Sequence, residues 1–327
     1  MSLALVSALL RREEEEFDSN LCTFETCDLV DSYYGYRPSL IANVVLTALF
    51  GISSAAFFLQ AFKSKQFIGF SVAMTLGTVG ETLGYVGRIL MHNNPWKEIP
   101  FMIQICCLTI APAFLAAGIY FCLSRIVTTF GRENSRIPAV WYPRIFITCD
   151  VIALILQAAG GGIASSADPG DSSADLGKNL MIAGVVFQVV TLGIFIVLAS
   201  DFAIRTWLRI RSLGAGALDA KYARLRDSTA FRSFLLALAI STLFIFVRCV
   251  YRIAELSGGW DGPLMKEEPL FIALEGGMVS AAVLVLNAFH PGRCFGQGYS
   301  DYSKADVASN ASYSEQELRM LPRQSSP

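Results

Sequence analysis

Long apolar runs separated by short polar segments recur along the whole chain. Seven runs, at about 39–62, 67–90, 100–123, 144–165, 179–203, 231–255 and 269–289, each approach the roughly 20 residues that a helix needs to cross a bilayer. They lack the period-two alternation of strands and are about twice as long as a barrel strand. The pattern therefore predicts an all-α polytopic membrane protein, a bundle of seven transmembrane helices.

Composition and charge strengthen this prediction and orient the chain. Of its 327 residues, 54% are hydrophobic and only 16% are charged, whereas about a quarter are charged in a soluble domain. Seventeen of the 26 Lys and Arg residues lie in alternate loops and the C-terminal segment. Because basic residues are retained on the cytoplasmic side, the N-terminus is predicted outside and the C-terminus inside.

This orientation divides the chain into three parts. We predict an extracellular acidic tail over 1–38, a seven-span membrane domain over 39–290, and a disordered cytoplasmic tail over 291–327. The basic loop from Arg205 to Arg232 is expected to lie against the anionic inner leaflet, although it could equally serve only to set topology. Of eight cysteines, only Cys22 and Cys27 fall on the oxidising side, so we predict a disulfide between them.

Charged residues interrupt the second run, "GTVGETLGYVGRIL". At 100° per residue, Glu81 and Arg88 share one face, and Tyr85 lies close to it. The adjoining face carries glycines at small-xxx-small spacing, which allows another helix to approach closely: Gly77, Gly80, Gly84 and Gly87. The charges are therefore predicted to point into the bundle.

Three other runs carry similar residues. An ionised side chain near the centre of a span costs about 2.5–3.5 kcal/mol, so these groups must pair with one another or line a wet cavity. Both interpretations stay open, fixed interhelical ion pairs or a substrate cavity, and the second is preferred. The candidate substrate-binding residues are Glu81, Tyr85, Arg88, Asp150, Gln157, Arg248, Tyr251, Arg252, Glu255 and Glu275.

Within this set, three arginines face three carboxylates. We expect Arg88, Arg248 and Arg252 to neutralise Glu81, Glu255 and Glu275. Glu275 is the preferred acceptor for a cationic head group, because the glycine pair in "EGG" is expected to leave room beside it. In span 4, Gly161 is expected to lie beneath Gln157.

Several classes of seven-span protein are excluded by missing residues. No span contains the lysine that retinal requires, and the only histidines, His92 and His290, are expected at opposite membrane faces, too far apart to bind one haem. The phosphate-cradling loop of ATP-driven transporters and the common hydrolase and metalloprotease motifs are absent from the sequence. We therefore predict a non-enzyme without a metal or cofactor. A G-protein-coupled receptor shares the topology, but its span 3 and span 7 signatures are missing.

Several spaced motifs resemble a known family. "ETLGYVGR", "APAFLAAGIY", "QAAGGG", "YRIAEL" and "FHPGR" occur in order and are similar to the fungal lipid-translocating exporters, the RTA-like seven-span proteins. The resemblance implies export of sphingoid long-chain bases or similar amphipathic compounds, resistance to toxic lipids and, in one branch, porphyrin uptake.

The resemblance also sets the functional expectations. We expect a floppase-like exporter in the plasma membrane, with another endomembrane as the alternative location. Its partners would be membrane lipids and an amphipathic small molecule, not nucleic acid, and oligomer formation is left open. The alternative function is a seven-span sensor that acts indirectly on lipid asymmetry or stress resistance.

Overall fold

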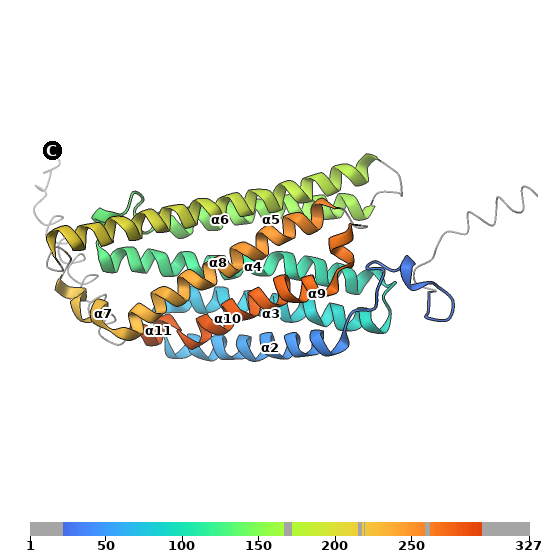
Figure 1. The fold of residues 1–327 in the computed structure, drawn as a ribbon, viewed down its shortest axis with the longest axis horizontal. Helices are drawn as coiled ribbons and strands as arrows, with labels where there is room; N and C mark the ends of the chain where they lie inside the picture. The colour runs from blue at the N-terminus through green and yellow to red at the C-terminus, as the bar shows by residue number, and fades with distance from the viewer. Residues whose placement is uncertain (1–21, 167–171, 215–217, 219, 259–261, 296–327) are drawn as a thin grey trace, which may run out of the picture.

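The computed structural model describes residues 22–166, 172–214, 218, 220–258 and 262–295, and it is a bundle of long helices (Figure 1). Seven helical segments have the length and composition to cross a membrane, which confirms the predicted all-α, seven-span architecture. Six are single helices: α2 (Leu40–Lys63), α3 (Ile68–Asn93), α4 (Glu98–Phe130), α5 (Trp141–Ser166), α6 (Ser172–Leu213) and α8 (Thr229–Ser257). The described residues contain no strand.

The seventh segment is built from several pieces. It begins with α9 (Glu268–Leu270), continues through the π-helix η7 (Phe271–Gly277) and α10 (Met278–Ala288), and ends with α11 (Pro291–Cys294). A π-helical turn inside a longer helix is rare and is frequent at functional sites. Here it carries Glu275.

Short helices connect these segments. They are η1 (Leu29–Asp31), η2 (Lys65–Phe67), η3 (Arg132–Asn134), η5 (Ala220–Tyr222), α7 (Ala223–Asp227) and η6 (Pro263–Lys266). Figure 1 places α7 at one end of the bundle and the segment before α2 at the other. The two ends therefore differ in sequence and charge.

The helices close into a ring, in which α4 is the most buried span. Consecutive segments pack on one another from α2 to α8, and α10 contacts both α8 and α2. Helix α4 also contacts α8 and α6, so it is the innermost helix. The ring's outer surface is apolar, with Ile41 79%, Ile52 72% and Val197 67% exposed. Such a surface is stable only against lipid or another apolar partner.

The glycine stripe of α3 forms a close helix contact with α4, as its spacing predicts. A Cβ atom added to Gly87 would lie 2.8 Å from the carbonyl oxygen of Pro100, and one added to Gly84 would lie 2.5 Å from Leu108 Cδ2. Since the Pro100 carbonyl is backbone and cannot yield as the Leu108 side chain can, glycine at position 87 is what allows α3 and α4 to approach this closely.

Residues 22–38 pack over one end of the bundle. Tyr34 is only 2% exposed, and Trp96, which begins the connection to α4, donates a hydrogen bond from Nε1 to the Asp28 carbonyl at 3.2 Å. Cys22 and Cys27 are joined by the predicted disulfide, with their Cα atoms 5.4 Å apart. The described part of the N-terminal segment is thus an ordered cap on the bundle.

Candidate functional site

Five charged side chains from three segments meet inside the bundle. We call Glu81, Arg248, Arg252, Glu255 and Glu275 the charged cluster. None of them is more than 2% exposed. They come from α3, α8 and η7, so the cluster joins segments that are far apart in the sequence.

Arg248 connects three helical segments through one guanidinium. Its Nε donates to Glu275 Oε1 at 3.0 Å, and its Nη2 also donates to that oxygen and to the backbone carbonyl of Leu108. That carbonyl lies four residues before Pro112, which has no N–H with which to complete the helical hydrogen bond. The "APAF" motif of α4 thereby creates the acceptor that Arg248 occupies.

Arg252 pairs within its own helix. Its Nη1 donates to Glu255 Oε2 at 2.6 Å, one helical turn along α8. Its Nη2 donates to Thr109 Oγ1 at 3.2 Å, which ties the pair to α4. Tyr251 is next in the chain and is 6% exposed, but its hydroxyl has no hydrogen-bond partner among the described residues.

Glu81 is the carboxylate that lacks a pair. It is fully buried, and neither of its oxygens has a hydrogen-bond partner within the described part of the chain. Its nearest charges are Glu275, Arg248 and Arg252, so it interacts with the cluster electrostatically. Two arginines therefore face three carboxylates, and the cluster has one negative charge in excess when all are ionised.

Arg88 lies apart from this cluster, contrary to the predicted three-against-three pairing. It donates to Asn43 Oδ1 at 3.2 Å, to the Tyr36 hydroxyl at 3.0 Å and to Glu268 Oε1 at 3.4 Å. Its guanidinium also lies 4.0 Å from the ring centroid of Phe271. The charge pattern missed Glu268 because this residue precedes the seventh apolar run. A carboxylate directly before a span could have been recognised in the sequence as a possible partner for Arg88.

The tyrosines near Arg88 are held in a similarly dry environment. Burial raises the pKa of Tyr36 above its ordinary value, and Arg88 opposes part of that rise. Burial also raises the pKa of Tyr34. Both phenols therefore stay protonated at neutral pH and can act as hydrogen-bond donors or acceptors for Arg88's end of the bundle.

The remaining predicted residues form a second polar region, between α4, α5 and α6. Gln157 Nε2 donates to Gln188 Oε1 at 3.2 Å. Asp150 is 3% exposed, and its oxygens have no partner with hydrogen-bond geometry among the described residues. The Tyr120 hydroxyl interacts with this carboxylate electrostatically. Asp150 is thus a second buried carboxylate that no arginine neutralises.

The contacts of Tyr85 and of the glycines in η7 and α5 show which parts of the bundle interior are filled by side chains and which are open. A Cβ atom on Gly276 would lie 2.8 Å from Leu46 Cδ1 and 3.0 Å from the Tyr85 hydroxyl. The space beside Gly276 is therefore filled by packing, so this glycine does not leave the expected room next to Glu275, whereas a Cβ atom on Gly277 would meet only the Ile272 carbonyl, at 3.5 Å. In α5, Gly160 makes the close contact, with α6, whereas Gly161 and Gly162 face open space.

That open space belongs to an apolar groove, the first groove. It has a volume of about 530 Å³ and is lined by residues of α4, α5 and α6 with Tyr33 at one end. Glu98, which forms no hydrogen bond or ion pair among the described residues, lies at its edge, and Gln157 and Thr109 lie along it. From Glu98 to Thr109 the groove follows α4 for about 16 Å, at 1.5 Å per residue.

A second groove follows the other half of α4. It has a volume of about 500 Å³, lies between α4, α6 and α8, and is lined by apolar side chains such as Phe130, Leu235 and Trp207. Thr206 contributes a buried hydroxyl that has no partner in the described chain. Two apolar grooves thus lie along opposite halves of the central helix.

Comparison with known proteins connects this arrangement to a family. A family model described as "RTA1 like protein" matches residues 74–298. The sphingoid long-chain base transporter RSB1 of Saccharomyces cerevisiae (strain Lalvin EC1118) is 32% identical over 285 residues, covering 80% of this chain and 74% of the relative.

More distant relatives come from the same yeast species. Protoporphyrin uptake protein 1 is 29% identical over 235 residues, covering 72% of each chain, and protein RTA1 is 27% identical over 282 residues, covering 79% of this chain and 84% of the relative. The names that state an activity describe transport and uptake rather than catalysis, in agreement with the non-enzyme prediction. No solved structure matches the chain.

Proposed function

Because the chain belongs to the RTA1-like family, we propose that it moves sphingoid long-chain bases, or similar amphipathic amines, from one membrane leaflet to the other. The similarity to a protein named as a sphingoid long-chain base transporter supports this substrate class. A sphingoid base carries an ammonium head and a long apolar tail. The bundle must then offer a place for each.

The excess carboxylate of the charged cluster carries this proposal. Glu81 is buried without a partner beside two arginines that are already paired. An unpaired charge in a membrane interior costs about 2.5–3.5 kcal/mol, so a cation that neutralised it would recover much of that energy. Glu81 therefore fits an ammonium better than Glu275, which is held by Arg248.

The first groove supplies a place for the tail. Its volume of about 530 Å³ lies within the 300–1,000 Å³ typical of ligand pockets, and its lining is largely apolar. Thr109 lines the groove and accepts the hydrogen bond from Arg252, so it is the contact between groove and cluster. We infer that this contact opens when the head group passes.

Movement between leaflets also requires a route on the other half of the bundle. The second groove provides apolar lining there, and Asp150 on α5 offers a further buried carboxylate. In this proposal a head group passes from Glu81 toward Asp150 while the tail stays in contact with lipid. Gln157, Tyr251 and the two arginine pairs would position it.

Reconstitution into vesicles tests this function. A fluorescent long-chain base is added to the outer leaflet, and its movement is followed by extraction with albumin. We expect the wild-type protein to accelerate movement, and Glu81→Gln and Asp150→Asn to abolish the acceleration without lowering the yield of folded protein. Glu133→Gln, which alters a carboxylate that is 76% exposed, is the matched control.

Each result of the vesicle experiment decides something. If the wild-type protein moves no more base than empty vesicles do, the transporter proposal fails, and binding of the base in a thermal-shift assay would then favour the sensor. If Glu81→Gln moves base at the wild-type rate, the acceptor assignment fails and the transport proposal stands.

Topology and location belong to the same proposal. We propose an N-terminus outside and a plasma-membrane location, supported by the disulfide at one end and the basic loops at the other. A membrane-impermeant thiol reagent, applied to intact cells before and after mild reduction, should label Cys22 and Cys27 only after reduction. Labelling only in permeabilised cells would contradict this orientation.

A further inference from the structure

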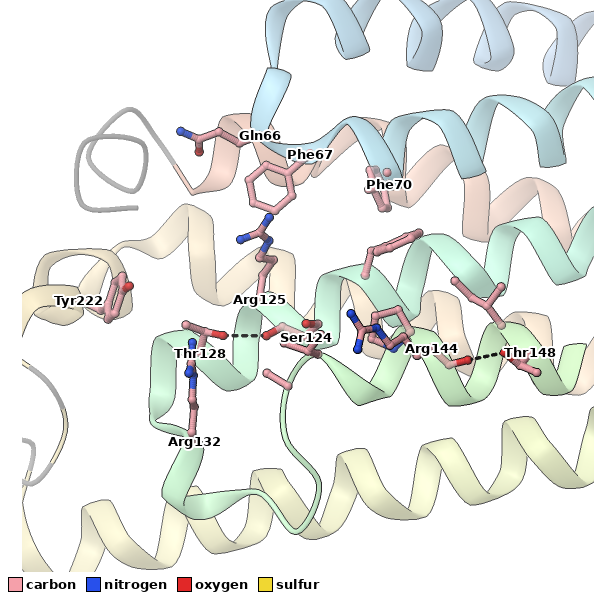
Figure 2. A pocket seen from close by; sticks show the side chains of 16 residues that line it. Gln66, Phe67, Phe70, Ser124, Arg125, Thr128, Arg132, Arg144, Thr148 and Tyr222 are labelled. Atoms are coloured by element: carbon pink, nitrogen blue, oxygen red, sulfur yellow. Dashed lines mark hydrogen bonds between the residues drawn. The ribbon is translucent and has the colours of Figure 1, made fainter. Parts of the chain in front are cut away.

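A pocket of about 780 Å³ lies at the end of the bundle that also holds α7 (Figure 2). We call it the basic pocket. It is formed by the beginnings of α3 and α5, the end of α4 with the turn that follows, and Tyr222. Arg125 and Arg132 come from the end of α4 and its turn, and Arg144 comes from α5, as Figure 2 shows.

The three arginines of this pocket have no ion-pair partner in the described part of the chain. Other arginines at the same end do: Arg136 and Arg205 both pair with Asp201 at 2.9 Å, Arg209 pairs with Glu133, and Arg232 pairs with Asp227. The described lining of the basic pocket contains no Asp or Glu. Three positive charges thus share one hollow without a counter-charge from the described residues.

The pocket also has hydrogen-bonding groups. The Thr128 hydroxyl donates to the Ser124 carbonyl at 3.1 Å, and the Thr148 hydroxyl donates to the Arg144 carbonyl at 2.7 Å, so both oxygens are held in place. Each threonine hydroxyl has given its single proton to a carbonyl, so the donors left for a ligand are the arginines and the side chain of Ser124, which also lines the pocket. Guanidinium groups bind phosphate through two parallel N–H donors, which makes arginine the usual residue where phosphate is recognised.

Apolar side chains also line the pocket. They include Phe67, Phe70, Phe121 and Val140, and Phe121 and Val140 are 36% and 52% exposed on the bundle's surface. An inorganic anion would leave these side chains without a contact. A molecule with a phosphate and an attached acyl chain would contact both the arginines and the apolar side chains.

We propose that the basic pocket binds the phosphate head group of an anionic membrane phospholipid, with the acyl chain lying against Phe121. The distribution of basic residues predicts that this end faces the cytoplasmic leaflet, which is the leaflet rich in anionic lipid. This site is separate from the charged cluster and does not depend on the transport proposal.

Binding of short-chain lipids to the full-length purified protein tests the proposal. Dioctanoyl phosphatidate, dioctanoyl phosphatidylcholine and inorganic phosphate are titrated separately in neutral detergent. We expect saturable binding of phosphatidate, with phosphatidylcholine and inorganic phosphate each at least about tenfold weaker. Replacing Arg125, Arg132 and Arg144 together by Gln should weaken phosphatidate binding roughly 100-fold, since each basic residue near a lipid surface contributes about a factor of five.

A charge-matched control separates a pocket from general attraction. Replacing Arg205, Arg211 and Arg224 by Gln removes three charges from the same end but none from the pocket lining, and it should leave phosphatidate binding within about twofold. A filled pocket gives an independent check. Thr148→Trp keeps all three arginines but adds bulk at an exposed lining position, and it should weaken binding by at least about tenfold.

Three results would overturn the proposal. The first is an equal loss in the pocket and control variants, which would mean attraction by net charge alone. The second is phosphate binding as tight as phosphatidate binding, which would indicate a site for a soluble anion. The third is wild-type binding by Thr148→Trp. Each variant is first matched to wild type in its elution volume and unfolding temperature, and Thr148→Trp, which keeps the three arginines, decides the proposal if the triple Gln variant does not fold.

Discussion

Ion pairs of nearly the same length occur in two regions that differ in their contact with solvent. Arg252 and Glu255 lie 2.6 Å apart inside the bundle, with side chains 1% and 2% exposed. Arg209 and Glu133 lie 2.7 Å apart at the end of the bundle, with side chains 31% and 76% exposed. The distance between the charges is therefore a poor measure of what each pair does for the protein.

The difference lies in what remains when a pair is broken. A surface charge that loses its partner is hydrated, so such pairs are worth about 0–1 kcal/mol. A buried charge that loses its partner stays in a dry environment, and breaking such a pair costs about 3–5 kcal/mol. The buried pairs also hold α8 to α4 and to η7, whereas the surface pairs hold the loops and helix ends.

The largest expected effect comes from breaking the central buried pair. Arg248→Gln leaves Glu275 buried without its cation and removes the donor to Leu108. We expect the free energy of unfolding to fall by about 3–5 kcal/mol, measured by denaturation in mixed micelles. Glu275→Gln should be destabilising too, because it leaves Arg248 buried. Wild-type stability of both variants would contradict the comparison.

Replacing both members of the pair sharpens the comparison. In Arg248→Met with Glu275→Leu, neither member of this pair is left as an unpaired charge, and apolar side chains of similar size fill the space. The free energy of unfolding should then fall by only about 1–3 kcal/mol. This remaining loss corresponds to the Leu108 carbonyl, which is left without a donor. A double variant that is no more stable than Arg248→Gln would show that packing, not charge, dominates this region.

Restoring the backbone hydrogen bond tests whether the unpaired Leu108 carbonyl accounts for the stability that the double variant still lacks. Adding Pro112→Ala to the double variant returns an N–H to position 112, which can donate to the Leu108 carbonyl. We expect recovery on the order of 1 kcal/mol, measured in the same micelles. In the wild-type background, Pro112→Ala should stabilise the protein by less, because the Leu108 carbonyl already accepts a hydrogen bond from Arg248. Equal gains in the two backgrounds would refute the link between Pro112 and Arg248.

The smallest effect is expected at the surface. Glu133→Gln breaks the 2.7 Å pair with Arg209, and the freed guanidinium stays in water and keeps its hydrogen bond to Asn134. The free energy of unfolding should change by at most about 1 kcal/mol, and by less at high salt. A loss comparable to that of Arg248→Gln would mean that burial does not separate the two regions.

Much of the fold was predictable because the membrane imposes simple rules. The apolar runs located all seven spans, although the helices extend further than the runs; α6, for example, covers Ser172–Leu213. The glycine stripe correctly predicted the close face of α3, since spacing alone sets which residues share a helix face. These features depend on local sequence and on the bilayer's thickness.

The pairing of the charges was less predictable because it depends on helix order and depth. The sequence set three arginines against three carboxylates without assigning pairs, and the structure pairs Arg248 with Glu275 and Arg252 with Glu255. Arg88 instead reaches Glu268, outside the predicted span, which leaves Glu81 alone. The basic pocket was missed for a similar reason: its arginines were read only as topology signals, and whether each one has a partner depends on contacts between loops.

The contact between Arg88 and Glu268 has a consequence for the order of synthesis. The two residues are 180 positions apart, so at about 5–20 residues per second Arg88 waits about 10–40 s for its carboxylate to be made. Asn43 and Tyr36, which are made earlier, already contact the guanidinium. We infer that they protect the nascent chain during this interval. Asn43→Ala should therefore slow maturation in a pulse–chase experiment more than it lowers the finished protein's stability, and the reverse result would sink this inference.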